Sequence, residues 1–319
     1  MLRAFFIFLS KASWAQNLIT RWGVAWRAAS RFIAGETGED AIRAIQQLNA
    51  VGILATVDHL GENTSTAAEA RQSTDEILQI LDLIHASSVQ ANVSIKLSQI
   101  GLLLDEDLCR QNLSRILDHA RLMDNFVRID MEDSTLTDKT LACLRWARNQ
   151  GFSNVGIVIQ SYLYRSDKDL AVLIDEGIRV RLVKGAYREP ATAAYPAKSD
   201  VDAAFDRLTE MMIAGTQKRG VDIVPANGRF PAFSAIASHD PDRIQTARDK
   251  QEEYNLPTNA LEFQMLYGIR RDLQQQLSAA GYPVRVYVPY GTRWYPYFMR
   301  RLAERPANVW FFLSNFFRH

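Results

Sequence analysis

Two adjacent arginines near the carboxyl end of the chain have a spacing that suits ligand binding. Arg300 and Arg301 follow Tyr297 and precede Glu304, so the four side chains share one face of a predicted helix. Guanidinium groups hold a carboxylate through paired hydrogen bonds, while a neighbouring tyrosine ring covers apolar surface. The pattern favours a site for a carboxylate with an apolar body. Adjacent arginines on helices are more often solvated surface, so this interpretation depends on where the fold places them.

Further charged side chains occur in five short segments in which aliphatic and polar residues alternate. Alternation indicates β-strands, because successive side chains of a strand point to opposite faces of the sheet. Several such strands in a chain rich in helical patterns indicate a barrel, with aliphatic side chains against the helices and charged ones in the lumen. A charge in the lumen is costly unless it is paired or used. The segments are residues 93–98, 127–132, 181–183, 261–264 and 284–287.

The strand period of two predicts which side chains face the lumen. Arg128, Glu262 and Arg285 come early in their strands, and for them we expect a structural layer of ion pairs across the barrel floor. The rest of the predicted lumen-facing set is Thr56, Asp58, Ser94, Lys96, Ser98, Asp130, Glu132, Gln160, Arg181, Gln264 and Tyr287.

Four members of this set lie near the carboxyl ends of their strands, where barrel enzymes carry their active sites. For Lys96, Asp130, Gln160 and Arg181 we therefore expect a role in function. Lys184 is three residues beyond Arg181, and strand parity points its amine away from the lumen. Lys96 stays a candidate for the imine-forming lysine of a Schiff-base aldolase.

Eight strand-like runs alternate with helical patterns along the chain. The helical patterns include residues 76–84 and 108–123. This alternation is typical of a (β/α)8 barrel rather than of an open sheet. The runs lie at residues 52–57, 92–98, 126–131, 154–160, 179–185, 233–238, 260–265 and 283–288.

We expect two parts along the chain. Residues 1–50 read as a helical segment that packs on the barrel or on a membrane, and residues 51–319 as the catalytic barrel. The chain length fits one large domain of this kind. Residues 221–232, which are rich in proline and glycine, read as a loop or an extra strand before the sixth run.

Several classes of function find no support in the sequence. The formal net charge of +1 gives no reason to expect nucleic acid. The glycines form neither a G-x-G-x-x-G motif nor a P-loop, so no Rossmann-type dinucleotide site is predicted. His59 and His239 lack the spacing of metal ligands, and no metal site is predicted. Cys109 and Cys143 are far from any Cys-x-x-Cys spacing and are expected to be buried thiols in a reducing compartment.

The two ends of the chain have unusual compositions. Residues 1–35 contain five basic and no acidic residues, and residues 5–9 form an apolar run. The run is short and is followed by Lys11, so a basic amphipathic segment that docks on the barrel or on an anionic membrane fits better than a signal peptide. Residues 310–317 are apolar and aromatic, and we favour a helix packed on the barrel over a membrane or subunit contact.

Three segments resemble signature motifs of one enzyme family. They are residues 181–189 (Arg-Leu-Val-Lys-Gly-Ala-Tyr-Arg-Glu), 287–291 (Tyr-Val-Pro-Tyr-Gly) and 297–304 (Tyr-x-x-Arg-Arg-x-x-Glu). On these motifs the chain resembles the proline dehydrogenase family, and segments 127–132, 237–240 and 262–268 fall in the family's order. The resemblance covers nearly the whole chain from about residue 50 and suggests the monofunctional bacterial type.

The resemblance implies a distorted (β/α)8 barrel with extra N-terminal helices and non-covalent FAD across the strand ends. It implies oxidation of L-proline to Δ1-pyrroline-5-carboxylate, the first step of proline catabolism to glutamate, with electrons passed to a membrane quinone. Pyrroline-5-carboxylate dehydrogenase is then the expected pathway partner. The implied location is the cytoplasm, and a peripheral contact with the inner face of the cell membrane is compatible with it.

The resemblance also assigns residues to the substrate. Arg300, Arg301 and Lys96 would hold the carboxylate, and Glu62 would pair with Arg300 as a gate, although a solvated loop acid is an equally good interpretation of Glu62. The apolar ring would be walled by Tyr187, Leu266, Tyr287 and Tyr297.

For the cofactor and catalysis, the resemblance places Arg181 near flavin N5 and gives Asp130 the task of orienting or pairing with active-site cations. The flavin-contacting positions it implies are Met131, Gln160, Arg181, Val183, Lys184, Gly185, Ala186, Ser238 and His239.

Three alternatives stay open. One is a trans-4-hydroxy-L-proline dehydrogenase, although Tyr287 favours proline because relatives that use the hydroxylated substrate tend to carry a smaller residue there. The second is the aldolase that uses Lys96, and the third is a non-catalytic, membrane-docked carboxylate sensor.

Overall fold

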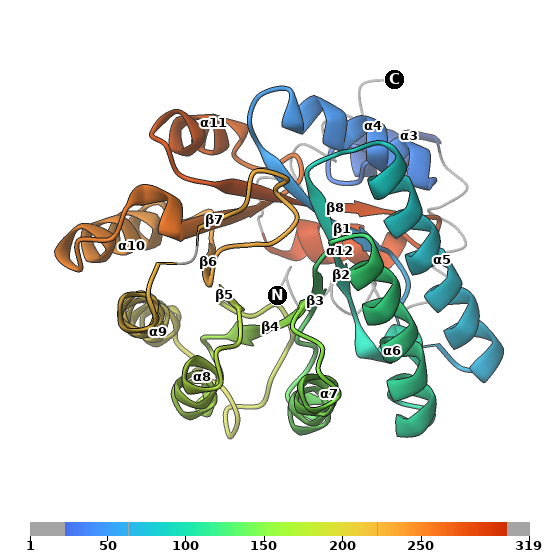
Figure 1. The fold of residues 1–319 in the computed structure, drawn as a ribbon, viewed down its shortest axis with the longest axis horizontal. Helices are drawn as coiled ribbons and strands as arrows, with labels where there is room; N and C mark the ends of the chain where they lie inside the picture. The colour runs from blue at the N-terminus through green and yellow to red at the C-terminus, as the bar shows by residue number, and fades with distance from the viewer. Residues whose placement is uncertain (1–22, 63, 222, 305–319) are drawn as a thin grey trace.

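The computed structural model describes residues 23–62, 64–221 and 223–304, and eight parallel strands within them close into a barrel (Figure 1). Each strand pairs with the next in chain order, and β8 pairs with β1. The predicted (β/α)8 architecture is therefore confirmed. The strands are β1 (Leu54–His59), β2 (Ala91–Ile95), β3 (Val127–Ile129), β4 (Val155–Gln160), β5 (Val180–Val183), β6 (Ser234–Ala237), β7 (Leu261–Leu266) and β8 (Val284–Tyr290).

Helices form a layer around the barrel (Figure 1). The helical patterns at residues 76–84 and 108–123 lie in α5 and α6 as predicted, and the described residues of 221–232 form a loop rather than a strand. The helices are α3 (Gly23–Ala29), α4 (Gly38–Asn49), α5 (Ala67–Ala86), α6 (Glu106–Leu122), α7 (Thr137–Asn149), α8 (Ser166–Asp175), α9 (Lys198–Arg219), α10 (Pro241–Glu253), α11 (Arg271–Ala279) and α12 (Tyr295–Glu304), with short 3-10 helices η1 (Leu97–Ile100) and η2 (Thr258–Ala260).

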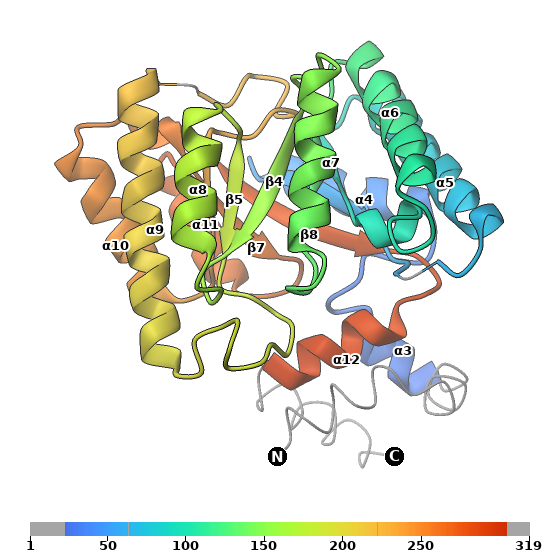
Figure 2. The same ribbon diagram turned by 90° about the horizontal axis from the view of Figure 1, so that it is seen from below.

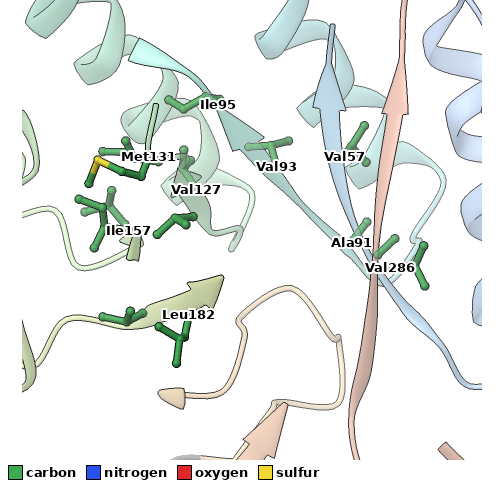
Figure 3. Close-up of a cluster of buried hydrophobic side chains, with 14 of the residues drawn as sticks. Val57, Ala91, Val93, Ile95, Val127, Met131, Ile157, Leu182 and Val286 are labelled. Carbon is green, nitrogen blue, oxygen red and sulfur yellow. The ribbon is translucent and has the colours of Figure 1, made fainter. Parts of the chain in front are cut away.

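The alternating pattern divides each strand between the core and the lumen. Val57, Val93, Val127 and Val155 are neighbours in register across β1 to β4, and they pack in the main hydrophobic core with the surrounding helices. Figure 3 shows aliphatic side chains of this core on several adjacent strands. The residues one position later in each strand therefore point into the lumen, as the period of two predicts.

The last helix among the described residues, α12, does not flank the barrel. The helix that follows the eighth strand of a regular barrel covers the outside of the sheet. Here α4 packs against β1 and β8 instead, and α12 lies across the carboxyl ends of the strands (Figure 2). A capping box between Thr37 and Asp40 starts α4 and fixes where this helix begins. Because α4 covers β1 and β8, the arginines of α12 can face the mouth of the barrel.

The second helix at this end of the molecule is α3, which lies beside α12 (Figure 2). The ring of Phe32, just after α3, is 6.4 Å from that of Phe298, and the rings of Trp26 and Trp294 are 5.5 Å apart. The predicted apolar run at residues 5–9 and the aromatic stretch at residues 310–317 lie outside the described residues. In the described parts of the chain, no helix is both long and apolar enough to cross a membrane.

The ion-pair layer that we expected across the barrel floor is present only in part. Arg285 and Glu262 form an ion pair at 2.8 Å, and neither is exposed. Arg128 was expected in the same layer, and this prediction is wrong: among the described residues it forms no ion pair. One nitrogen of its guanidinium, Nη1, donates instead to the main-chain oxygens of Ile157 (3.0 Å) and Arg179 (2.5 Å), while Nε and Nη2 are buried without a hydrogen-bond partner.

Two strands end earlier than predicted. β2 and β3 stop one residue before Lys96 and Asp130, so both side chains lie on the segments that leave the barrel. Just beyond them, Ser98 donates its main-chain N–H (3.0 Å) and its hydroxyl to the carboxylate of Glu132. This contact joins the two outgoing segments. Ser98 and Glu132 were both predicted to face the lumen, but they do not line the cavity described next.

The buried thiols are as predicted. Cys109 in α6 and Cys143 in α7 are both reduced and almost fully buried.

Candidate active site

A cavity of about 500 Å³ opens between the carboxyl ends of the strands and α12. This volume is typical of small-molecule sites. Every residue that the sequence assigns to the substrate, the cofactor or the gate lines this cavity, from Glu62 and Lys96 to Ser238, His239 and Arg301. The structure thus brings the predicted set together in one place, and the roles of its members stay predictions.

Lys96 is the centre of a buried polar cluster. Its ammonium donates to both carboxylate oxygens of Asp58 at 3.0 Å and to the hydroxyl of Tyr287 at 3.2 Å, and it lies 3.4 Å from Asp130. Burial opposes a charged lysine here, but the negative charge of Asp58, together with the smaller effects of Tyr287, Asp130 and Glu62, raises the pKa of Lys96 well above its ordinary value. Lys96 is therefore a fixed cation at the wall of the cavity.

Arg181 and Asp130 form a second ion pair beside the first. Arg181 donates to Asp130 at 3.0 Å and to the side-chain oxygen of Gln264 at 2.5 Å. Asp130 also accepts a hydrogen bond of 2.8 Å from the Tyr287 hydroxyl. Burial opposes the ionised form of Asp130, but the charges of Lys96 and Arg181 lower its pKa. Two carboxylates and two cations thus balance one another beneath the cavity.

The α12 residues form the opposite wall. Tyr297, Arg300 and Arg301 line the cavity as their predicted helical face requires, while the side chain of Glu304 lies outside the described residues. Arg301 is only 7% exposed, and its guanidinium carbon lies 5.0 Å from the centre of the Tyr297 ring. The expected pair between Glu62 and Arg300 is present. Nη1 and Nη2 of Arg300 donate to the carboxylate of Glu62 at 2.9 and 2.5 Å.

The segment that follows β5, residues 184–186, contributes main chain to the cavity wall. Lys184 donates to the carboxylates of Asp202 and Asp240, away from Lys96, as strand parity predicts. Gly185 has a φ of +124°, and a Cβ at this position would lie 2.5 Å from the ring of Tyr162. Only glycine fits this backbone, which brings the main chain of 184–186 along the cavity wall.

The polar groups at this side of the cavity suit a flat, polar cofactor. The side-chain oxygen of Gln160 is buried and has no hydrogen-bond partner, while its amide nitrogen donates to the main-chain oxygen of Met131. Nε2 of His239 accepts from the Leu266 N–H at 2.9 Å, which places the proton of a neutral ring on Nδ1. With Arg181 nearby, these groups fit the flavin of FAD: an unsatisfied polar atom, a close main-chain approach and a buried cation.

Sequence reasoning left several residues out of the site. Asp58 and Gln264 belong to the predicted lumen-facing set, so the period of two was the signal that could have found them. Lys198 begins α9, fourteen residues beyond Lys184, and no pattern links it to the cavity. The other lining residues without an assigned role are Val158, Ala237, Asp240 and Met265.

A parallel barrel with a cationic wall and a polar recess at its carboxyl end is typical of a barrel enzyme for a small carboxylate substrate. A model of the family described as proline dehydrogenase matches residues 41–313. The chain belongs to the proline dehydrogenase family.

Individual relatives match over almost their full length. Proline dehydrogenase 1 of Bacillus subtilis (strain 168) is 39% identical over 314 residues, which cover 98% of both chains. Proline dehydrogenase of Deinococcus radiodurans is 43% identical over 291 residues, 90% of this chain and 89% of its own. The expected similarity to the monofunctional type is therefore confirmed.

Among solved structures, proline utilization A (PutA) from Bdellovibrio bacteriovorus inactivated by N-propargylglycine has a TM-score of 0.78 at 24% identity. The similarity covers 88% of this chain and 33% of that protein, and at this identity it supports the barrel fold alone.

Proposed function

We propose that this chain is an FAD-dependent dehydrogenase that oxidises L-proline to Δ1-pyrroline-5-carboxylate and passes the electrons to a membrane quinone. The observation that carries the proposal is the meeting of two features in one cavity. A cationic wall of Lys96, Arg300 and Arg301 faces a recess formed by the end of β5 with Gln160 and Arg181. Membership of the proline dehydrogenase family supports the assignment of substrate and cofactor.

The cavity offers a carboxylate and an apolar ring separate surfaces. Lys96 and Arg301 present positive charge, and Arg300 can add a third cation next to them. The guanidinium of Arg301 lies at this wall, where it can hold a substrate carboxylate through paired hydrogen bonds. The ring would lie among the side chains of Tyr187, Leu266, Tyr287 and Tyr297, which come from the segment after β5, from β7, from β8 and from α12.

The residues that would hold FAD are those at the ends of β3 to β6, with the main chain at Lys184, Gly185 and Ala186 lying against it. Bound FAD supplies an acceptor for a hydride, which the side chains of this barrel cannot provide. Arg181 is buried beside this recess, where its positive charge would stabilise negative charge that develops on the acceptor.

The remaining protein groups position the substrate and control protons. Holding the carboxylate at one end fixes the ring carbon next to the nitrogen, and such positioning can lower a barrier by several kcal/mol. The ring nitrogen must lose its proton so that its lone pair can stabilise the developing iminium. Burial raises the pKa of both Tyr187 and Tyr287. Their hydroxyl groups therefore stay protonated around neutral pH and add no charge near that nitrogen.

Two of the alternatives lose support from the same geometry. A Schiff-base lysine needs a neutral amine, but Lys96 is held in its charged form by Asp58 and Asp130. A hydroxylated proline needs room for its hydroxyl, and the Tyr287 ring lies in the cavity wall, fixed through its own hydroxyl to Asp130.

Steady-state kinetics test this assignment. The purified, FAD-loaded chain should reduce a soluble quinone with L-proline, and kcat/KM for trans-4-hydroxy-L-proline should be lower. Equal or higher kcat/KM for the hydroxylated substrate would move the assignment to that enzyme. No turnover with either substrate would favour the carboxylate sensor.

The membrane side of the proposal rests on the basic composition of residues 1–35. The protein would be cytoplasmic and would contact the inner face of the membrane through this stretch. Pyrroline-5-carboxylate dehydrogenase would consume the product. Liposome co-sedimentation with anionic lipid should decrease when residues 1–22 are deleted. The deletion should not extend to residue 35, because Phe32 and Ile33 pack with α12 and their loss would expose Phe298. Unchanged co-sedimentation would exclude this segment as the membrane contact.

A further inference from the structure

Asp58 is a buried carboxylate directly behind the cationic wall of the cavity. It lies in β1, is not exposed at all, and does not line the cavity. Both of its oxygens accept from the ammonium of Lys96 at 3.0 Å. A carboxylate in this position touches the proposed substrate only through Lys96.

The two carboxylates near Lys96 have different principal partners. Asp130 accepts from Arg181 at 3.0 Å, from Tyr287 at 2.8 Å and from Ser94 at 2.6 Å, and its distance to Lys96 is longer, at 3.4 Å. Asp58 directs both oxygens at Lys96. The two shorter ion pairs of the cluster are therefore Asp58 with Lys96 and Asp130 with Arg181; the longer contact of Lys96 with Asp130 links them.

A lysine in this environment needs its counterion. Burial favours the neutral amine, and a buried lysine without a negative neighbour loses its proton at a lower pH. The charged and polar groups that face Lys96 are Asp58, Asp130, Tyr287 and Glu62. Asp130 is already engaged by Arg181 and Glu62 by Arg300, which leaves Asp58 as the carboxylate that Lys96 does not share with an arginine.

We propose that Asp58 is a positioning residue: it keeps Lys96 charged and aimed at the cavity, so that Lys96 can bind the substrate carboxylate. This inference rests on the proposed function, since it assumes that a carboxylate binds there. Burial raises the pKa of Asp58 itself to about 6, with the charge of Lys96 acting against that rise. Asp58 is thus ionised around neutral pH, where its charge can hold the ammonium of Lys96.

The test compares carboxylate binding in the FAD-loaded wild type and Asp58→Asn, which keeps the shape of the side chain and removes its charge. The probe is cyclopentanecarboxylate, which has the ring and carboxylate of proline without the amine, and calorimetry gives its Kd without turnover. We expect Kd to rise by about tenfold or more at neutral pH. The rise should grow towards alkaline pH, because Lys96 then deprotonates earlier than in the wild type. Asp167→Asn, at an exposed ion pair with Arg207, is the matched control and should leave Kd unchanged.

A double-mutant comparison separates this role from a structural one. If Asp58 acts through Lys96, adding Asp58→Asn to Lys96→Met leaves the Kd of Lys96→Met unchanged. An equal loss of affinity in both backgrounds would overturn the proposal. So would a Kd for Asp58→Asn that matches the wild type over the whole pH range.

Two further measurements keep the test decisive. If Asp58→Asn does not fold, Asp58→Glu replaces it: a retained charge should preserve the pH profile while Kd rises, and a profile with an earlier alkaline loss would overturn the proposal. Reduction of the bound flavin by L-proline in the wild type is recorded in parallel. Wild type that neither binds the probe nor is reduced by proline contradicts the proposed function. Intact wild-type behaviour with an unaffected Asp58→Asn contradicts only the role of Asp58.

Discussion

Glu62 and Arg300 join two distant parts of the chain across the mouth of the cavity. Glu62 follows β1, Arg300 lies in α12, and two hydrogen bonds of 2.9 and 2.5 Å connect them. Burial opposes the ionised carboxyl, but the charges of Arg300 and Lys96 and the hydrogen bond from Arg300 together lower the pKa of Glu62. The pair is therefore intact at neutral pH, and its stabilisation is lost only as the pH falls through that lowered value.

The first prediction concerns ligand release. Glu62→Gln weakens the link between the loop after β1 and α12, so a bound carboxylate should leave faster, by about three- to tenfold for a partly buried pair. Stopped-flow displacement of cyclopentanecarboxylate at neutral pH measures this rate. Asp75→Asn, at an exposed ion pair on α5, is the control. An unchanged release rate would show that the pair is not a gate.

The second prediction concerns the stability of the barrel floor. Arg285→Met leaves the carboxylate of Glu262 buried without its partner, which should cost about 3–5 kcal/mol of unfolding free energy. Chemical denaturation measures the loss. The corresponding change at the exposed pair of Arg145 and Glu176, Arg145→Met, should cost about 1 kcal/mol or less. Similar losses for the two variants would contradict the structural role of the buried pair.

The third prediction concerns cofactor uptake. Gly185→Ala forces a Cβ against the Tyr162 ring and strains a backbone with positive φ, so the main chain at the cavity wall must move. Bound FAD per chain should fall clearly, as read from the visible absorbance of the purified protein. Gly151→Ala has a positive φ of +87° but open space around the Cβ, and should keep its FAD. Equal flavin content in the two variants would argue against a flavin at Gly185.

The fourth prediction concerns substrate choice. Tyr287→Ser removes a ring from the cavity wall and makes room for a substituent on the substrate, so the kcat/KM ratio of hydroxyproline to proline should rise by about tenfold or more. Tyr287→Phe keeps the ring and removes only the hydroxyl that contacts Lys96 and Asp130. This control should not favour hydroxyproline. A ratio that rises equally in both variants would mean that the hydroxyl, rather than the ring, sets the preference.

Alternation along the strands was enough to predict the barrel and the side chains in its lumen, because the strand period is local. Alternation could not predict which groups these lumen side chains contact. Asp58 and Arg128 both belong to the lumen-facing set, yet Asp58 binds Lys96 and Arg128 binds main-chain oxygens. Which carboxylate a lumen arginine reaches depends on register and on gaps such as Gly156, next to Arg128, which arise only when the sheet closes.

The position of α12 was likewise beyond the local pattern. Its sequence predicts a helix with Tyr297, Arg300 and Arg301 on one face, and the structure agrees. Whether that helix flanks the barrel or crosses its mouth depends on α4, which covers β1 and β8 from a part of the chain 250 residues away. The spacing of Tyr297, Arg300 and Arg301 indicated a carboxylate ligand, but only the family resemblance named proline as that carboxylate.

The central claim is that this barrel transfers a hydride from L-proline to bound FAD. Anaerobic titration of the FAD-loaded chain with L-proline tests it most directly, by following the flavin absorbance near the visible maximum. We predict that the absorbance is bleached to completion, and that Arg301→Met needs a much higher proline concentration for the same bleaching. A chain that takes up no FAD, or a bound flavin that proline leaves oxidised, would contradict the account.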